Sequence, residues 1–158
     1  MTSEDVALKR LLIVYYSKTG NTQRMAEWIG DGAREEGVEV ELKRVEDCGV
    51  DELAGADGLV LGTPTYFSNM AWQVKKLVDE SITLYRKEHL LRGRVAGCFT
   101  SSGTQRDGED CIRMMELTLG HHHEMNVLPG VSRAAWGKEE KVAEMCREYG
   151  AELARMLI

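Results

Sequence analysis

The sequence predicts an α/β fold in which a doubly wound parallel sheet of five strands, in the order 2-1-3-4-5, carries helices on both faces. Three observations predict it. Apolar runs that suit buried strands alternate along the 158 residues with segments of helical periodicity. Residues 38–45 instead alternate apolar and polar side chains, which is typical of a half-buried edge strand. The first apolar run ends in a loop of hydroxyl side chains that leads into a helical pattern.

The predicted elements follow one another without a repeat or a linker, so we expect one domain over residues 1–158, with residues 1–9 flexible. Asn69 is expected to cap the helix that begins at residue 71, and Trp72 to pack that helix on the sheet. Strands are expected at 11–16, 38–45, 58–63, 94–100 and 125–128, and helices at 21–36, 50–54, 71–84, 110–119 and 138–158.

Composition excludes several function classes. The net charge is -6 and basic residues are scattered, which argues against nucleic acid as a partner. No apolar stretch approaches the roughly 20 residues of a membrane span, and the charged first residues are no signal peptide, so we expect a cytoplasmic protein. The four cysteines are widely spaced, which suits reduced structural thiols and not an iron–sulfur cluster.

The loop after the first strand has the features of an anion site. A small-residue loop at a helix N-terminus presents free backbone N–H groups, and the helix dipole favours negative charge. The spacings of triphosphate and dinucleotide loops are absent, so a terminal phosphomonoester is the expected anion, with an ordinary strand–helix turn as the alternative. The loop residues are Ser17, Lys18, Thr19, Gly20, Asn21 and Thr22.

Two further loops should lie beside the first, because the carboxyl ends of parallel strands share one edge of the sheet. The loop after the strand at 58–63 holds two aromatic residues that suit stacking on a flat ring, although Phe67 could instead pack on the next helix. The loop after the strand at 94–100 again offers hydroxyls and backbone N–H groups. The candidate residues are Pro64, Thr65, Tyr66, Phe67, Ser68 and Asn69 in one loop, and Thr100, Ser101, Ser102, Gly103, Thr104 and Gln105 in the other.

These motifs carry a resemblance to a known family. The first loop resembles the phosphate-binding signature of the flavodoxin-like proteins, which hold FMN. The motifs Gly-Thr-Pro-Thr-Tyr-Phe-x-Asn-Met (62–70), Phe-Thr-Ser-Ser-Gly-Thr-Gln (99–105) and the His-His segment at 119–129 resemble the WrbA-type branch, the FMN-dependent NAD(P)H:quinone oxidoreductases. The resemblance implies that 17–22 hold the phosphate, 64–67 line the isoalloxazine, 101–105 close the pocket, and His123 approaches the flavin. Catalysis would then be modulated by His123 and Tyr66.

Two departures from the family pattern are informative. The family usually has Gly after the Phe, and this chain has Ser68. In one-electron flavodoxins the glycine carbonyl near the flavin can flip, and a side chain makes that flip harder, so Ser68 favours two-electron chemistry. The chain is also a short variant that lacks segments with which the family builds a tetramer, so a dimer is expected. Trp136 and Tyr85 could reach the mouth of the site or a partner subunit.

The run His121–His123 has three interpretations. It could bind a metal, it could form a polar helix end that places His123 near the flavin, or it could be a solvated turn. No metal site is predicted, because Glu124 is the only adjacent carboxylate.

Three functions are weighed. The leading hypothesis is an FMN enzyme that NAD(P)H reduces and that passes two electrons to a quinone or similar acceptor. The second is a flavodoxin-like electron carrier, whose acidic charge suits docking to basic redox proteins. The third is an FMN-binding regulatory or assembly module without turnover.

Overall fold

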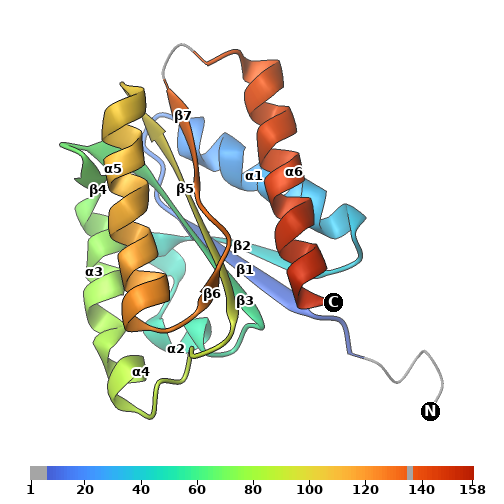
Figure 1. The fold of residues 1–158 in the computed structure, drawn as a ribbon, viewed down its shortest axis with the longest axis vertical. Coiled ribbons are helices and arrows are strands. Elements are labelled where there is room, and N and C mark those ends of the chain that lie inside the picture. The colour runs from blue at the N-terminus through green and yellow to red at the C-terminus, as the bar shows by residue number, and fades with distance from the viewer. Residues whose placement is uncertain (1–6, 135–136) are drawn as a thin grey trace.

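The computed structural model of the chain describes residues 7–134 and 137–158, and it confirms the predicted fold class (Figure 1). Parallel strands are ordered β2-β1-β3-β5-β6, with β7 also paired to β5 and β4 antiparallel to β3, so the predicted order holds once β4 is set aside. The elements are β1 Arg10–Tyr15, α1 Asn21–Glu35, β2 Glu39–Arg44, η2 Val45–Asp47, α2 Val50–Leu53, β3 Gly58–Tyr66, β4 Asn69–Met70, α3 Trp72–Glu80, α4 Ile82–Arg86, β5 Val95–Ser102, α5 Gln105–Glu116, η3 Leu117–His122, β6 Asn126–Val127, β7 Val131–Ala134 and α6 Glu139–Leu157.

Helices cover both faces of the sheet, as the buried strands require. Figure 1 shows α3 and α5 on one face, and α1 and α6 on the other. Side chains of β1 alternate between the two cores: Leu12 and Val14 pack on the α3/α5 side, and Leu11 and Ile13 on the α1/α6 side. The uninterrupted apolar run of β1 therefore reflects a central strand that is buried on both faces.

The edge strand and the α1–α6 contact follow from their residue types. Residues 40–44 of β2 are half-buried, as expected for an edge strand. α1 and α6 cross closely at two glycines. A Cβ on Gly32 would lie 1.9 Å from the carbonyl oxygen of Arg147, and one on Gly150 would lie 1.9 Å from that of Ile29. Any larger residue there would force the two helices apart.

The helix expected at 71–84 differs in three ways. Ser81 divides it into α3 and α4, and the Ser81 hydroxyl donates to the carbonyl of Val78 at 2.6 Å. Trp72 does not pack on the sheet: it is 70% exposed, because the buried face of α3 runs through Val74 and Leu77. Ala71, not Asn69, precedes the first turn, since Asn69 belongs to β4 and its side chain accepts from its neighbour's backbone N–H.

Two other elements depart from their predicted bounds. α5 begins at Gln105, five residues earlier than expected, because Thr104 caps it: the Thr104 Oγ1 accepts from the backbone N–H of Asp107 at 3.2 Å. The last strand is divided into β6 and β7, and only β6 lies within the predicted range 125–128. Within the part of the chain that the structure describes, no helix is long and apolar enough to cross a bilayer.

Candidate functional site

The three predicted loops meet at the carboxyl edge of the sheet, and hydroxyl groups join them. The Thr22 Oγ1 in the first loop lies 2.9 Å from the Ser101 Oγ in the third. The Thr100 hydroxyl donates to the carbonyl of Thr63 at 2.6 Å and lies 2.7 Å from the Thr65 Oγ1, which therefore donates to it. Several of the hydroxyls that the sequence suggested as ligand contacts thus hold the loops to one another.

The first loop leaves the N-terminus of α1 open. Gly20 precedes the helix with φ of 99°, a left-handed conformation that suits glycine, and no side chain caps the first turn. The Ser17 Oγ, which is buried, accepts from the backbone N–H of Gly20 at 3.2 Å and so closes the loop. From outside, Arg44 of β2 donates to the carbonyl of Ser17 at 2.7 Å. The arrangement presents backbone N–H groups and the positive end of the helix dipole to the edge of the sheet.

The second loop is a tight hairpin that the sequence did not predict. β3 continues through Pro64 to Tyr66. Proline is tolerated at this position because β1 pairs with β3 only as far as Gly62, so β1 needs no hydrogen bond from the backbone nitrogen of residue 64. Phe67 and Ser68 then form a two-residue turn to β4 with φ of 51° and 62°. Both central residues of a type I′ turn need positive φ, which costs a bulky residue about 1–2 kcal/mol.

Phe67 is held in this strained conformation with its ring fully exposed. It does not pack on the following helix, which was the alternative for this residue. Tyr66 beside it is also exposed, and partial burial together with Tyr16 raises the pKa of its hydroxyl, so Tyr66 stays neutral at physiological pH. A strained backbone that presents two aromatic side chains at the ligand edge of an α/β sheet is typical of a functional turn.

A hydrogen bond ties this turn to the third loop region. The Ser68 Oγ donates to the Asp107 Oδ1 at 2.9 Å, and Asp107 is in the first turn of α5. The turn is therefore fixed at its base by the β3–β4 pairing and at its tip by α5. Asp107 was not among the predicted site residues, and only the three-dimensional structure brings it to Ser68.

The remaining predicted residues divide by exposure. Ser17, Thr22, Thr100 and Ser102 are buried, whereas Lys18, Thr19, Asn21, Gly103, Thr104 and Gln105 are exposed at the rim, and Pro64, Thr65, Ser68, Asn69 and Ser101 are half-buried. A pocket of about 190 Å³ opens between the first and third loops. Its lining comprises Asn21, Thr65, Ser101, Ser102, Gly103, Arg133 and Ala134. Arg133 of β7 is a site residue that the sequence reasoning missed, because β7 itself was not predicted.

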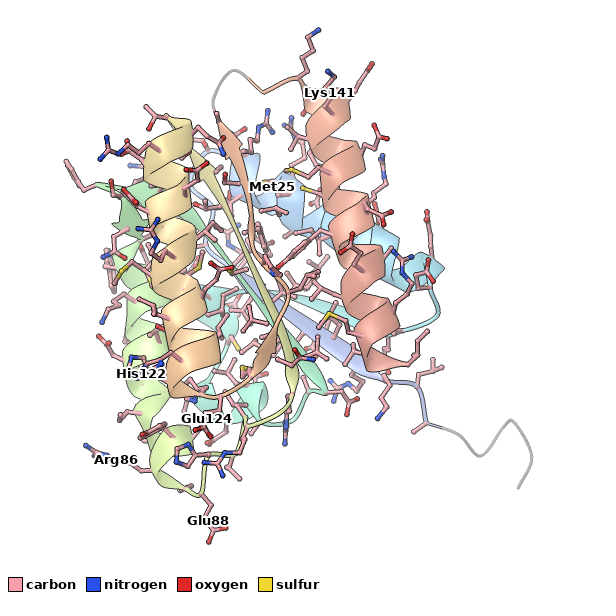
Figure 2. All side chains as sticks on the ribbon, viewed as in Figure 1. Met25, Arg86, Glu88, His122, Glu124 and Lys141 are labelled. Carbon is pink, nitrogen blue, oxygen red and sulfur yellow. The ribbon has the colours of Figure 1, made fainter. Side chains whose placement is uncertain are left out.

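His123 lies at the opposite edge of the sheet, which corrects the expectation that it approaches a flavin. α5 starts beside the end of β5 and runs back along the sheet, and β6 then pairs its Asn126 with Val95, the first residue of β5. Figure 2 shows His122 and Glu124 beyond the far end of α5, whereas Met25 of α1 lies towards the other end of the molecule. A ligand held by the three loops is therefore out of reach of His123.

His123 has a structural environment at this far edge. It is buried, and its Nε2 lies 2.9 Å from the Ser81 Oγ; because Ser81 donates to a backbone carbonyl, the imidazole donates to Ser81. Burial, followed by the charge of two neighbouring histidines, lowers the pKa of His123. Tyr85, a second candidate for the mouth of the site, stands edge-on to the same ring with the centroids 6.2 Å apart. Trp136 lies outside the described residues.

The histidine run also shows no preformed metal centre. Within residues 7–134 and 137–158, no group of three or more His, Cys, Asp or Glu side chains is arranged to hold a metal ion.

Comparisons with known proteins agree with this geometry. The family model described as "Flavodoxin domain" matches residues 12–133. A flavodoxin of Aquifex aeolicus (strain VF5) is 31% identical over an alignment of 159 positions, which covers 92% of this chain and 85% of that protein. The structure of a flavodoxin from the domain Archaea superimposes with a TM-score of 0.80 at 26% identity, covering 94% of this chain and 98% of that one. A flavodoxin, WrbA-like protein from Agrobacterium tumefaciens gives 0.82 at 26% identity, covering 94% and 97%. The chain belongs to the flavodoxin domain family.

Proposed function

We propose that the chain binds FMN at the three loops. The observation that carries this proposal is the uncapped N-terminus of α1 behind Gly20, which offers backbone N–H groups and a helix dipole to an anion. The phosphomonoester of FMN suits that site, with Ser17–Thr22 around it. The exposed ring of Phe67, presented by a strained turn, suits contact with a flat ring system. The donors and the aromatic side chains therefore match the two ends of FMN.

When bound, FMN supplies hydride-transfer and electron-transfer chemistry. The chain's own residues bind and orient the group. The loop after β1 would hold the phosphate, and Pro64–Asn69 and Thr100–Gln105 would hold the isoalloxazine, with Tyr66, which is neutral and partly exposed, among the residues that contact it. None of these side chains needs to act as a covalent catalyst.

For the reaction, we propose the NAD(P)H-dependent, two-electron reduction of a quinone or a similar acceptor. The Ser68 tether supports two-electron chemistry, because a turn that is pinned to Asp107 and carries a Cβ resists a change of backbone conformation during reduction. The likeness to a WrbA-like protein supports the same choice. The position of His123 removes one residue from this mechanism and leaves Tyr66 as the modulating side chain.

An electron carrier without a substrate of its own is the second candidate. The likeness to the Aquifex flavodoxin over 92% of the chain favours it, and so does the net charge of -6, which suits association with basic redox proteins. A dimeric state and a cytoplasmic location remain proposals. The location is supported by the four cysteines, all of which are free thiols.

The test is anaerobic reduction of the FMN-loaded protein by NADH or NADPH, followed by a benzoquinone and monitored by visible absorbance. An oxidoreductase should bleach in one two-electron step and recover its colour with the quinone. A carrier should resist both nucleotides and accept electrons from dithionite in two separate one-electron steps.

Two variants separate the contributions of Ser68. Ser68→Ala removes the hydrogen bond to Asp107 but keeps the Cβ, and Ser68→Gly removes both. If the Ser68–Asp107 hydrogen bond and the Cβ favour two-electron reduction, the redox potentials of the two one-electron steps should lie further apart in Ser68→Ala than in the wild type. They should lie furthest apart in Ser68→Gly. Identical redox titrations of all three proteins would remove the structural support for two-electron chemistry.

A further inference from the structure

Arg133 brings a positive charge to an otherwise neutral pocket. It lies on β7, where it is opposite Ser101 of β5 in the sheet register. The other residues that line the pocket of about 190 Å³ are uncharged. They include Asn21, the first residue of the uncapped helix α1, and Thr65 at the start of the aromatic turn. Arg133 therefore lines one pocket together with residues of all three loops proposed for FMN.

The Arg133 side chain is incompletely satisfied within the described part of the chain. Its Nη1 atom is buried and has no hydrogen-bond partner there. It takes part in none of the ion pairs found among the described residues, and Glu139 at the start of α6 pairs with Arg24. A buried guanidinium N–H without an acceptor is costly, and such a group is expected to have a partner.

Cys146, on the α6 side of Arg133, carries no negative charge that could pair with the guanidinium. Burial raises the pKa of the Cys146 thiol in α6 to about 12. The nearby positive charge of Arg133 lowers that pKa, but its effect is smaller than that of burial. Cys146 is therefore neutral at physiological pH. The positive charge of Arg133 remains available to an anion that enters the pocket from the loops.

We propose that Arg133 is a cofactor-binding residue that pairs with the phosphate of FMN and makes the site prefer FMN over riboflavin. The inference rests on the proposed binding of FMN and goes further, because it assigns a charged contact from the last strand to a site whose other proposed contacts all come from the three loops, Lys18 of the first loop included. Guanidinium suits a phosphate, since its N–H groups match the phosphate oxygens in geometry and charge.

The test is fluorescence titration of the apoprotein, residues 1–158, with FMN and, separately, with riboflavin, which lacks the phosphate. Arg133→Met removes the charge while keeping most of the length of the side chain. A charged hydrogen bond of this kind should make FMN binding about 10- to 100-fold weaker when it is lost. Riboflavin affinity should stay within about twofold, because riboflavin lacks the group that Arg133 contacts.

Two further variants sharpen the test. Arg147→Met makes the same change of net charge at an exposed position of α6 that does not line the pocket, and it should leave both affinities unchanged. Arg133→Lys should recover part of the lost FMN affinity, and higher salt should weaken FMN binding to the wild type more than to Arg133→Met.

The outcomes are distinguishable. Equal losses for FMN and riboflavin would mean that Arg133 supports the fold of the loops, and would overturn the phosphate contact. Unchanged FMN affinity in Arg133→Met would overturn it as well. If the wild type binds neither flavin, the proposed function fails and the assignment of Arg133 fails with it.

Discussion

The hydroxyl of Tyr149 forms hydrogen bonds with backbone groups at the interruption between β6 and β7. Removing this hydroxyl gives a quantitative test of the fold. β6 pairs with β5 as far as Ala96, and β7 resumes the pairing at Phe99, so on this side Gly97 and Cys98 of β5 lack a strand partner, although β3 pairs with them on the other side. The buried hydroxyl of Tyr149, from α6, fills this gap. It accepts from the backbone N–H of Cys98 at 3.0 Å and donates to the carbonyl of Leu128 at 3.0 Å.

Tyr149→Phe should therefore leave two backbone groups without a partner, the buried N–H of Cys98 and the partly buried carbonyl of Leu128. Each such group costs about 1–3 kcal/mol, so the loss of unfolding free energy should be about 2–4 kcal/mol if the site relaxes slightly. For a chain of this length, the melting temperature falls by about 2–4 °C per kcal/mol, which gives a decrease of roughly 4–16 °C. The effect should not vary near neutral pH, because burial raises the pKa of Tyr149 and keeps its hydroxyl protonated.

Urea unfolding and calorimetry of both proteins measure the effect. Tyr85→Phe is the matched control: Tyr85 is partly exposed and its hydroxyl makes none of the hydrogen bonds found among the described residues, so its change should stay within about 0.5 kcal/mol. A loss below about 1 kcal/mol in Tyr149→Phe would contradict a structural role of this hydroxyl, since it would mean that water satisfies both backbone groups.

Three other substitutions test separate parts of the structure. The pKa of His123 is lower in the folded than in the unfolded protein, so the free energy of unfolding should fall as the pH drops below about 6.5, by up to about 1.4 kcal/mol per pH unit. In urea unfolding between pH 7.5 and 5.5, His123→Gln should show a smaller fall than the wild type. Equal falls in the two proteins would contradict this. Thr22→Val removes the hydrogen bond to Ser101. It should lower the free energy of unfolding in denaturant by about 1 kcal/mol and weaken FMN binding. Unchanged values of both would show that the loops do not depend on this contact. Gly150→Ala places a methyl group against the carbonyl of Ile29 and should cost about 1–3 kcal/mol, and an unchanged denaturation midpoint would argue against the tight helix crossing.

The sheet and its order could be predicted because the signal is local and strong. Buried parallel strands appear as continuous apolar runs, and the half-polar run at 38–45 marks the edge. The loops that converge on the carboxyl edge follow from the same topology. By contrast, the turn at Phe67–Ser68 lacks the Gly or Asn that normally signals positive φ, so the hairpin to β4 was not predicted.

The misplacement of His123 has a physical reason that the sequence already contained. In a parallel sheet with crossover helices, a segment between a helix and the next strand lies at the amino edge, opposite the ligand. The predicted helix at 110–119 and strand at 125–128 therefore placed residues 121–123 away from the loops. The interruption of the last strand could not be predicted, because Tyr149 from a helix far along the chain bonds to the backbone there. The position of Arg133 could not be predicted either, because it depends on the pairing of β7 with β5 beyond that interruption.

The most direct test of FMN binding at the three loops is a map of the residues that respond to FMN. Backbone amide NMR spectra of the labelled apoprotein, recorded during titration with FMN, report on each loop separately. Binding of FMN at the three loops should give saturable, one-to-one shifts at residues 17–22, 65–69 and 100–105, and little change at His121–His123. Shifts that gather around His123 and Tyr85, or the absence of saturable binding, would contradict it.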